Sequence, residues 1–343
     1  MTRPLLDELD RRLIGALHLA PRATWDDIGA ILSADASTLK RRYDRLQEAR
    51  MVRVIGQSDW GMHSTAMPVH VFLDIAGETP LAVLDRLRGL PHLQLLAQIS
   101  GDHPLYAVVH APSEAATSEA IDRMFSVPGV RHVKALPALS TLRRGITWDP
   151  QFLTDTERAE LLKLTGAPAA GTATATATPP AKSLSEAERT VVAQLIQDGR
   201  ASAASIARAA DLATSTAHRV VRRVLDERWV QPRLEIVSEW LGFQTPFMLR
   251  LRVAPGETPE VMRRLDQLAQ TRLAAHVASD MSVLATGLVT DRSALARFID
   301  DELAKIPGII TVSVDVMLAE PRRYWLDRDR VSGLGEFHAP TLL

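Results

Sequence analysis

ADASTLKRRYDRL, residues 34–46, is the stretch that decides the fold, because it recurs as LATSTAHRVVRRV at residues 212–224. In each copy the apolar residues are spaced three and four positions apart, which places them on one face of a helix. The opposite face carries basic residues. Five positions recur at a constant separation of 178: Ser37, Thr38, Arg41, Arg45 and Arg50 return as Ser215, Thr216, Arg219, Arg223 and Arg228. A basic helix face of this kind is what a recognition helix in a DNA groove requires.

Two shorter helices precede the basic helix. The first is predicted over residues 5–19, where the leucines lie on one face, and Pro21 prevents it from continuing. The second begins after Thr24, which can serve as its N-cap, and runs to Leu32. Asp35 or Ser37 can cap the third helix, which we end near Arg50. Three short helices with connections of about four residues form a helix-turn-helix unit. The same programme starts again after Ser183.

A different period follows each helical unit. Strands are predicted at 68–76, 93–100, 105–110 and 130–142, with helices beginning after Thr79-Pro80 and Ser113. The order is βαββαβ, the ferredoxin-like arrangement of a four-stranded antiparallel sheet with two helices on one face. Residues 255–259 echo 76–80, so this block is duplicated too.

The predicted fold is therefore α+β, with two winged or tri-helical helix-turn-helix domains, each followed by a ferredoxin-like domain. The predicted boundaries are 1–60 and 61–150 for the first pair, 151–182 for a connecting helix and a flexible Ala/Thr/Pro linker, 183–240 and 241–330 for the second pair, and 331–343 for a C-terminal tail.

Composition limits the possible partners. The formal net charge of −1 over 343 residues excludes bulk coating of DNA, so any nucleic-acid contact rests on a local patch. The absence of cysteine excludes disulfides and thiolate chemistry and fits a reducing cytoplasm. We find no signal peptide and no apolar run of the ~18–20 residues that a membrane helix needs. We expect a cytoplasmic protein.

The ordered motifs LDELDRRLIGAL with ASTLKRRYDRL, and LSEAERTVVAQLIQDGRAS with STAHRVVRRVL, resemble the Lrp/AsnC family of bacterial and archaeal transcriptional regulators. In each copy a βαββαβ domain with a PGV or PGI turn follows. The resemblance implies assembly through the sheet domains, called RAM domains, which often bind an amino acid between them. It also implies that the tandem chain is similar to a covalently joined dimer that oligomerises further.

Two features depart from the family pattern. Where the family usually ends the recognition helix with glycine, this chain has Arg50 and Arg228. A left-handed non-glycine residue costs on the order of 1 kcal/mol, so we expect the helix to run on. The family's effector loop resembles G-x-x-D, whereas Pro104 and Ser282 replace its aspartate here. Candidate effector-binding residues are those that remain in the two loops: Gly101, Asp102, Ser279, Asp280 and Ser282.

The hydroxyl and basic side chains of the two third helices are the candidate DNA-binding residues. Ser and Thr near a helix N-terminus and Arg41 suit base edges, whereas the later arginines suit phosphates. The full set is Ser37, Thr38, Lys40, Arg41, Arg42, Arg45 and Arg50, with Ser215, Thr216, His218, Arg219, Arg222, Arg223 and Arg228. Lys40 becomes His218 and Asp44 becomes Arg222, so we expect two non-identical half-sites in double-stranded DNA.

Other chemistry is weaker in this sequence. Histidines 63, 70, 92, 103 and 110 show no metal-ligand spacing and are interpreted as packing or surface residues, so neither a metal nor a cofactor is expected. No phosphate loop or catalytic triad is found, and we expect a protein that is not an enzyme. The alternative is a siroheme decarboxylase, because those enzymes resemble the same architecture. Of their basic, histidine-containing run, residues 57–68 offer only His63.

Overall fold

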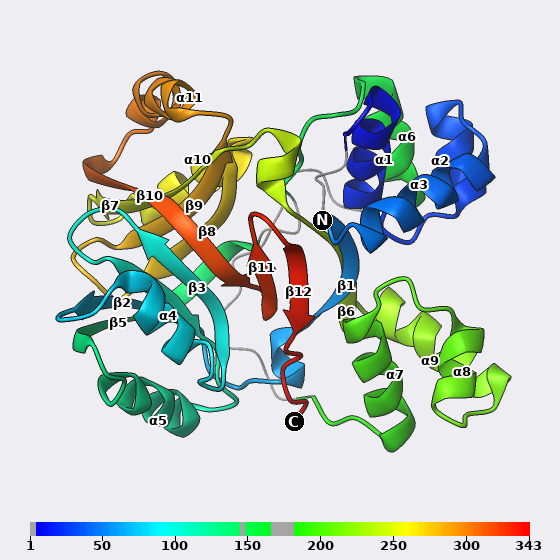
Figure 1. The fold of residues 1–343 in the computed structure, drawn as a ribbon, viewed down its shortest axis with the longest axis horizontal. Helices are drawn as coiled ribbons and strands as arrows, with labels where there is room; N and C mark the ends of the chain where they lie inside the picture. Colours follow the sequence, from blue (N-terminus) through cyan, green and yellow to red (C-terminus); the bar gives the residue numbers. More distant parts are fainter. Residues whose placement is uncertain (1–4, 145–147, 166–181) are drawn as a thin grey trace.

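The computed structural model describes residues 5–144, 148–165 and 182–343. Two groups of helices lie on one side of the molecule and a large curved sheet lies on the other (Figure 1). No helix of these residues has the length and apolar character needed to cross a membrane.

The first helical group forms as the sequence predicts. It contains α1 (Glu8–Leu19), α2 (Trp25–Leu32) and α3 (Ala36–Glu48), and β1 (Val52–Ser58) follows. A capping box between Asp7 and Asp10 begins α1, and the Thr24 side chain accepts from the N–H of Asp27 at the start of α2. These caps fix where the helices start, and the buried leucines fix which faces meet.

The second group repeats the first. It consists of α7 (Glu186–Gln197), α8 (Ala203–Ala209), α9 (Thr214–Asp226) and β6 (Val230–Ile236). Ser185 and Glu188 form the capping box of α7, at the positions that correspond to Asp7 and Asp10. One continuous apolar core joins both helical groups, so they form a single packed body.

The remaining chain forms two βαββαβ halves. The first is β2 (Val69–Ile75), α4 (Pro80–Leu87), β3 (Leu93–Ile99), β4 (Leu105–Val109), α5 (Glu114–Phe125) and β5 (Val130–Arg144). The second is β7 (Thr245–Val253), α10 (Thr258–Gln267), β8 (Thr271–Val277), β9 (Val283–Val289), α11 (Arg292–Arg297), the short turns η3 (Phe298–Glu302) and η4 (Leu303–Lys305), and β10 (Ile309–Arg323). Within each half the third strand lies between the first two in space, and the first pairs with the last, which is the ferredoxin-like order.

The two halves do not form separate sheets, and here the prediction of two independent four-stranded sheets needs correction. Strand β5 pairs with β8, and β10 pairs with both β3 and β7. The eight strands therefore close in the order β3-β4-β2-β5-β8-β9-β7-β10 and back to β3. Closure removes the exposed strand edges that each half would otherwise present to other chains.

Closure creates an inside and an outside. Helices α4 and α5 cover the outer face of the first half, and α10 and α11 cover that of the second, each with its own apolar core (Figure 1). A further cluster, which includes Phe72, Tyr106, Met248 and Met317, draws its residues from strands of both halves. The interior thus belongs to neither half alone.

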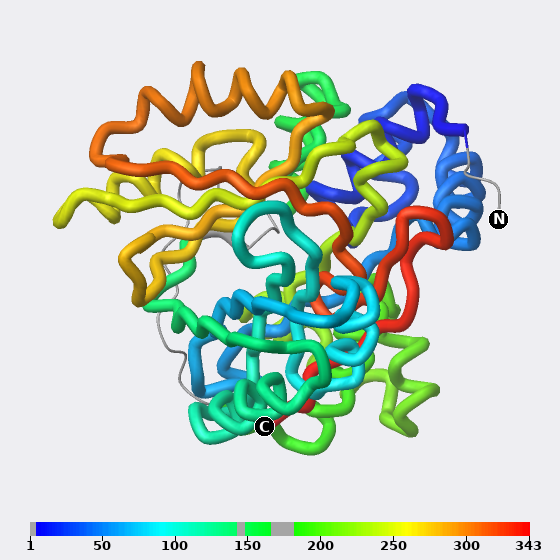
Figure 2. The backbone as a smooth tube through the Cα atoms, turned by 60° about the vertical axis from the view of Figure 1, so that its left-hand side comes forward, coloured from blue at the N-terminus to red at the C-terminus, as the bar shows by residue number. Residues whose placement is uncertain are grey.

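The segments predicted as connector and tail pack against the body. Helix α6 (Asp155–Thr165) lies against α1 and α2, and its Glu157 pairs with Arg12. The predicted C-terminal tail is corrected, because it contains β12 (Gly333–Phe337), which pairs with β11 (Leu326–Asp329). This hairpin lies between the closed sheet and the helical groups (Figure 2). Most of the predicted flexible linker, residues 166–181, lies outside the described residues.

The expectation that the third helix runs on is wrong in both copies. Helix α3 ends at Glu48 and α9 at Asp226, and Arg50 and Arg228 each adopt a left-handed conformation with φ of 55°. The N–H of Met51 donates to the carbonyl of Leu46, closing the helix end. The hydrogen bonds of this turn and the strand that follows it hold the arginine where the family has glycine.

Candidate nucleic-acid interface

The predicted DNA-binding side chains lie along the outer faces of α3 and α9. The structure leaves most of them exposed: Ser37, Lys40, Arg41, Arg45 and Arg50 in the first helical group, and Ser215, His218, Arg219, Arg222, Arg223 and Arg228 in the second. Thr38, Arg42 and Thr216 are half-buried. The apolar side of each helix is buried, through Leu39, Tyr43 and Leu46 in α3 and through the alanine and valines of α9.

Arg41 and Arg219 differ from the neighbouring Arg42, Arg45 and Arg223, which pair with acidic residues. They occupy equivalent positions, both are exposed, and neither makes an ion pair or side-chain hydrogen bond with any described residue. A guanidinium without a local partner keeps all five donors for a base edge or phosphate. The duplicated free arginine is the feature of this surface that best suits an external anionic ligand.

Arg45 and Arg223 have a structural role as well. The Arg45 Nη2 lies 2.6 Å from Asp10 Oδ2, and the corresponding Arg223 Nη1 lies 2.7 Å from Glu188 Oε1. Because Asp10 and Glu188 are also the capping-box residues of α1 and α7, each ion pair ties the third helix to the first. Arg42 pairs with Asp7 and Asp10 in the same way. Phosphate binding by these arginines stays a prediction.

The N-termini of both third helices lack side-chain caps. Asp35 precedes α3 and Ala213 precedes α9, and no side chain of the described residues accepts from the first-turn N–H groups of either helix. The expectation that Asp35 or Ser37 caps α3 is therefore wrong. Open N–H groups at a helix N-terminus favour phosphate, and Ser37 and Ser215 lie in the same first turn.

The two helical groups are joined by a symmetric set of contacts. Strands β1 and β6 pair antiparallel over their full length, with Ile55 opposite Arg233 at the centre. Beside them, Arg22 donates to the carbonyls of Gly199 and Ala201, and Arg200 donates to those of Pro21 and Ala23. Such reciprocal contacts are typical of a twofold dimer interface. They hold α3 and α9 in one fixed relation.

The C-terminal segment contacts both helical groups. The N–H of Leu334 on β12 donates to the carbonyl of Arg50, at the end of the first recognition helix. Further along, Arg189 on α7 donates to the carbonyl oxygens of Leu342 and Leu343. The segment therefore adds a second connection between the groups, beyond β1 and β6.

The candidate effector loops lie on the rim of the closed sheet. Gly101 has φ of +89°, and a Cβ there would lie 2.3 Å from Asp315 of the other half, so the position requires glycine. Asp102 and Asp280 are exposed, and Asp280 pairs with Arg252. Ser279 and Ser282 are half-buried. Each loop contacts the last strand of the opposite half, through Ser100 to Val316 and Ala278 to Pro137. Effector binding by these loops stays a prediction.

The histidines of the first half mostly pack. His63 and His110 are buried with ring centroids 4.8 Å apart, next to Trp60 and Trp325. His70 is buried, and its Nδ1 lies 2.6 Å from the hydroxyl of Tyr106. Burial lowers the pKa of His70 to about 4, so its ring is neutral. Within the described part of the chain, no three His, Asp or Glu residues converge in a way that could hold a metal ion.

Sequence reasoning missed a set of buried charges inside the closed sheet. A cavity of about 60 Å³ lies between the two halves, and its charged lining residues are Arg233, Arg272, Glu320 and Arg323. Arg233 and Glu235 are two positions apart in QPRLEI, which places them on the same face of a strand. That spacing could have indicated an ion pair on one face of the strand. The sequence alone could not show that this face is buried.

The fold and the exposed basic helices define a helix-turn-helix protein with a ferredoxin-like sheet assembly. Comparison with known families is consistent with this class: residues 6–47 match the AsnC-type helix-turn-helix domain. An uncharacterised HTH-type transcriptional regulator of Pyrococcus abyssi is 24% identical over 135 residues, which cover 39% of this chain and 85% of the relative. A counterpart in Pyrococcus horikoshii is 23% identical over the same shares. The matched segment spans α1 to α3, so the first helical group is similar to an AsnC-type helix-turn-helix domain.

Among solved structures, the siroheme decarboxylase NirDL has this fold. It covers 92% of this chain and 93% of its own, with 13% identity and a TM-score of 0.56. The same enzyme in complex with an iron-uroporphyrin III analogue gives a TM-score of 0.58 at 11% identity. The expectation of a non-enzymatic protein therefore has to be corrected, because an enzyme shares the architecture over nearly the whole chain. At these identities the match establishes the fold alone.

Proposed function

We propose that the protein is a cytoplasmic, sequence-specific DNA-binding regulator in which one chain supplies two HTH–RAM units. Arg41 and Arg219 carry the proposal, since both are exposed, unpaired among the described residues and placed at equivalent positions of α3 and α9. The uncapped N-termini of these helices add N–H groups for phosphate. In this arrangement Ser37, Thr38 and Arg41 contact base edges, and Arg50 contacts phosphate.

The pairing of β1 with β6 gives the proposal its geometry. In a homodimer two copies of one strand would meet across the twofold axis, and here two different strands of one chain do so. The chain is thus the internal counterpart of a dimer, produced by tandem duplication. We expect it to read two half-sites about one helical turn, or a multiple, apart. Further homo-oligomerisation through the RAM halves stays a prediction.

The two helical groups carry nearly equal numbers of basic and acidic residues, so we expect their affinity for DNA to depend on a few unpaired arginines. Residues 7–50 hold eight basic and eight acidic side chains, and residues 185–229 hold seven and six. Neither helical group is a polycation, and several arginines are already paired with α1 or α7. Non-specific attraction is therefore weak, and the loss of two free arginines has a large relative effect.

Selection from random double-stranded DNA followed by affinity measurement tests the proposal. The wild-type chain should enrich one imperfect palindrome, and R41A with R219A should lower the affinity for it by about 100-fold, at ~1–3 kcal/mol for each base contact. R297A on α11 is the matched control, because this exposed arginine lies on the opposite side of the molecule (Figure 1). No enriched sequence, or equal affinity of the double variant, would reject DNA recognition.

A siroheme-decarboxylase-like enzyme is the second candidate, favoured by the match to NirDL and by the arginines that line the interior cavity. Arginine is suited to hold carboxylates such as those of a tetrapyrrole. The cavity has room for about five water molecules, at roughly 10–15 Å³ for each, so the closed sheet would have to open for such a substrate.

Mixing the chain with siroheme tests the second candidate. An enzyme of this type should produce a shifted Soret band on binding and release carbon dioxide from the substrate. The band should weaken in R272M, which removes a cavity arginine, and persist in R297A. A spectrum equal to the sum of the separate components removes this candidate and leaves the DNA-binding proposal untouched.

A further inference from the structure

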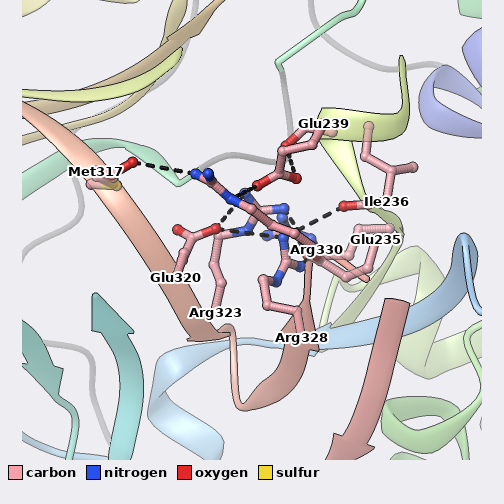
Figure 3. A network of polar contacts seen from close by, with 10 residues as sticks. Glu235, Ile236, Glu239, Met317, Glu320, Arg323, Arg328 and Arg330 are labelled. Atoms are coloured by element: carbon pink, nitrogen blue, oxygen red, sulfur yellow. Dashed lines mark hydrogen bonds and ion pairs between the residues drawn. The ribbon is translucent and has the colours of Figure 1, made fainter. Parts of the chain in front are cut away.

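A cluster of buried charges, drawn from β8 and β10 of the closed sheet and from the neighbouring strands β6 and β11, holds more positive than negative charge. Arg233, Arg272, Arg323 and Arg328 are each at least nine-tenths buried, as judged from the whole residue or the side chain. The carboxylates that face them among the described residues are Glu235 and Glu320. Arg330 and Glu239 adjoin this group as a further pair, which leaves the balance unchanged (Figure 3). Two positive charges remain without a matching carboxylate.

Glu235 satisfies three of the four arginines. Its carboxylate is fully buried and lies 2.7 Å from Arg233, 3.2 Å from Arg323 and 2.6 Å from Arg328. Arg323 and Arg328 also reach Glu320. These guanidinium groups hold the pKa of Glu235 well below its usual range despite burial, so it stays ionised. Its negative charge is fully used by this network.

Arg272 on β8 has no such partner. Only 9% of the residue is exposed, and no ion pair or hydrogen bond reaches its side chain from the described residues. Its guanidinium carbon lies 4.8 Å from the ring centroid of Trp148, a cation–π contact. Burial and the nearby Arg323 lower its pKa well below the ordinary value. An uncompensated buried charge costs several kcal/mol, so an anion beside Arg272 would remove a large penalty.

The cavity lies where that anion would bind. Arg272 lines it together with Arg233 and Arg323, so three guanidinium groups border one space of about 60 Å³. The carboxylate of Glu320 also lines the cavity and already pairs with Arg323, and Gln94, Thr286 and Tyr324 add polar groups. The rest of the wall is apolar, formed by Leu95, Tyr106, Val108, Pro246, Leu273 and Met317. Guanidinium groups bind carboxylate bidentately, and the apolar wall suits a short carbon chain rather than a fully hydrated inorganic anion.

We propose that this cavity is a binding site for a small organic monocarboxylate, held by Arg272 with Arg233 and Arg323. The volume admits a ligand of about four to six heavy atoms, since it accommodates about five waters. The site uses strands of both halves, so it exists only in the closed sheet. It is separate from the rim loops at Asp102 and Asp280, which do not line it. The inference stands independently of DNA binding.

Thermal unfolding of the full chain tests the site, with propionate as the probe. At 10 mM and constant ionic strength, propionate should raise the Tm of the wild type by about 2 °C, as expected for a ligand with a Kd of about 1 mM. Propionamide has the same shape without the charge, and inorganic phosphate has the charge without the carbon chain. Both should leave the Tm within 0.5 °C of the ligand-free value.

Two variants and one control complete the test. R272M should unfold at a higher Tm than the wild type without ligand, because it removes the uncompensated charge, and should lose the response to propionate. T286L should also lose the response, because it fills the cavity while keeping every arginine. R252M, at an exposed arginine of β7, should respond like the wild type.

Four results would overturn the proposal: no wild-type response to propionate, an equal response to propionamide, a larger response to phosphate, or a response that survives in both R272M and T286L. If R272M fails to fold, T286L alone decides the matter. None of these readouts involves DNA, so failure of the site and failure of the regulator proposal are distinguishable.

Discussion

Arg41 on α3 and Arg272 on β8 both lack an ion pair among the described residues, but water reaches the first and hardly reaches the second. On the helix surface an unpaired guanidinium is hydrated and costs nothing to keep. Inside the closed sheet the same group has lost its water and has gained only a cation–π contact. An unpaired arginine on the surface is therefore available to bind a ligand at no cost to stability. An unpaired arginine in the interior lowers the stability of the fold until an anion binds to it.

The variant with the largest expected effect on stability removes the carboxylate of Glu235, which is shared by three buried arginines. E235A leaves Arg233, Arg323 and Arg328 without their shared partner, and breaking a buried pair costs about 3–5 kcal/mol. We expect the Tm to fall by about 5 °C in calorimetry. E302A, at an exposed position, is the control. A fall of less than 2 °C would show that water enters the network and that the interior resembles the surface.

The next test uses pH, because His18 connects the interior to α1. His18 is buried, its two ring nitrogens have no described partner, and its ring lies 5.7 Å from that of Trp148. Burial together with Arg233 and Arg272 lowers its pKa to about 3. The charges that face it are those of Arg233, Arg272, Glu235 and Arg323.

The sign of the effect follows from linkage. The unfolded chain takes up a proton near pH 6.5, whereas the folded chain resists it down to about pH 3, so stability is complete above pH 6.5 and falls as the pH drops. At pH 5 the loss is about 2 kcal/mol for this histidine. H18L should remove that part of the slope in urea unfolding between pH 7.5 and 5, whereas H132L, at an exposed position, should leave it. If the unfolding free energy of H18L falls with pH as steeply as that of the wild type, the His18 ring is hydrated in the folded chain and its pKa is not lowered.

Much of the fold could be predicted from the sequence because its signals are local. The caps at Thr24, Thr79 and Ser113 form as predicted, and both halves have the expected element order. The closing of the sheet could not be predicted, because β5–β8 and β3–β10 pair residues more than a hundred positions apart, and no turn fixes their register. The interior site depends on that closure. From the sequence alone, Arg272 in TRLAAH is therefore predicted to be an ordinary exposed strand residue, and only closure against the first half buries it.

A smaller effect separates two arginines of the same helix. The side chain of Arg45 is about half exposed, and its partner Asp10 is buried, so the pair contributes at most about 1 kcal/mol after solvent screening. R45A should lower the Tm by about 1 °C, whereas R41A should leave it within 0.5 °C. A double-mutant cycle with D10N measures the pair itself. Equal effects of R41A and R45A on the Tm would remove the distinction between a free arginine and a structural one.

The smallest effect concerns the left-handed arginines at the helix ends. R228G should relieve the conformational cost of φ at 55°, with a gain of up to about 1 kcal/mol that the greater freedom of glycine in the unfolded chain partly offsets. R50G relieves the same cost, but here Gly333 of β12 lies against the Arg50 side chain and Leu334 donates to its carbonyl. We expect a smaller gain at Arg50, because the substitution also removes packing against the C-terminal hairpin. Urea unfolding of both variants measures this difference. Equal gains would mean that β12 only borders the first recognition helix, whereas a smaller gain at Arg50 would show that the hairpin helps to hold its end in place.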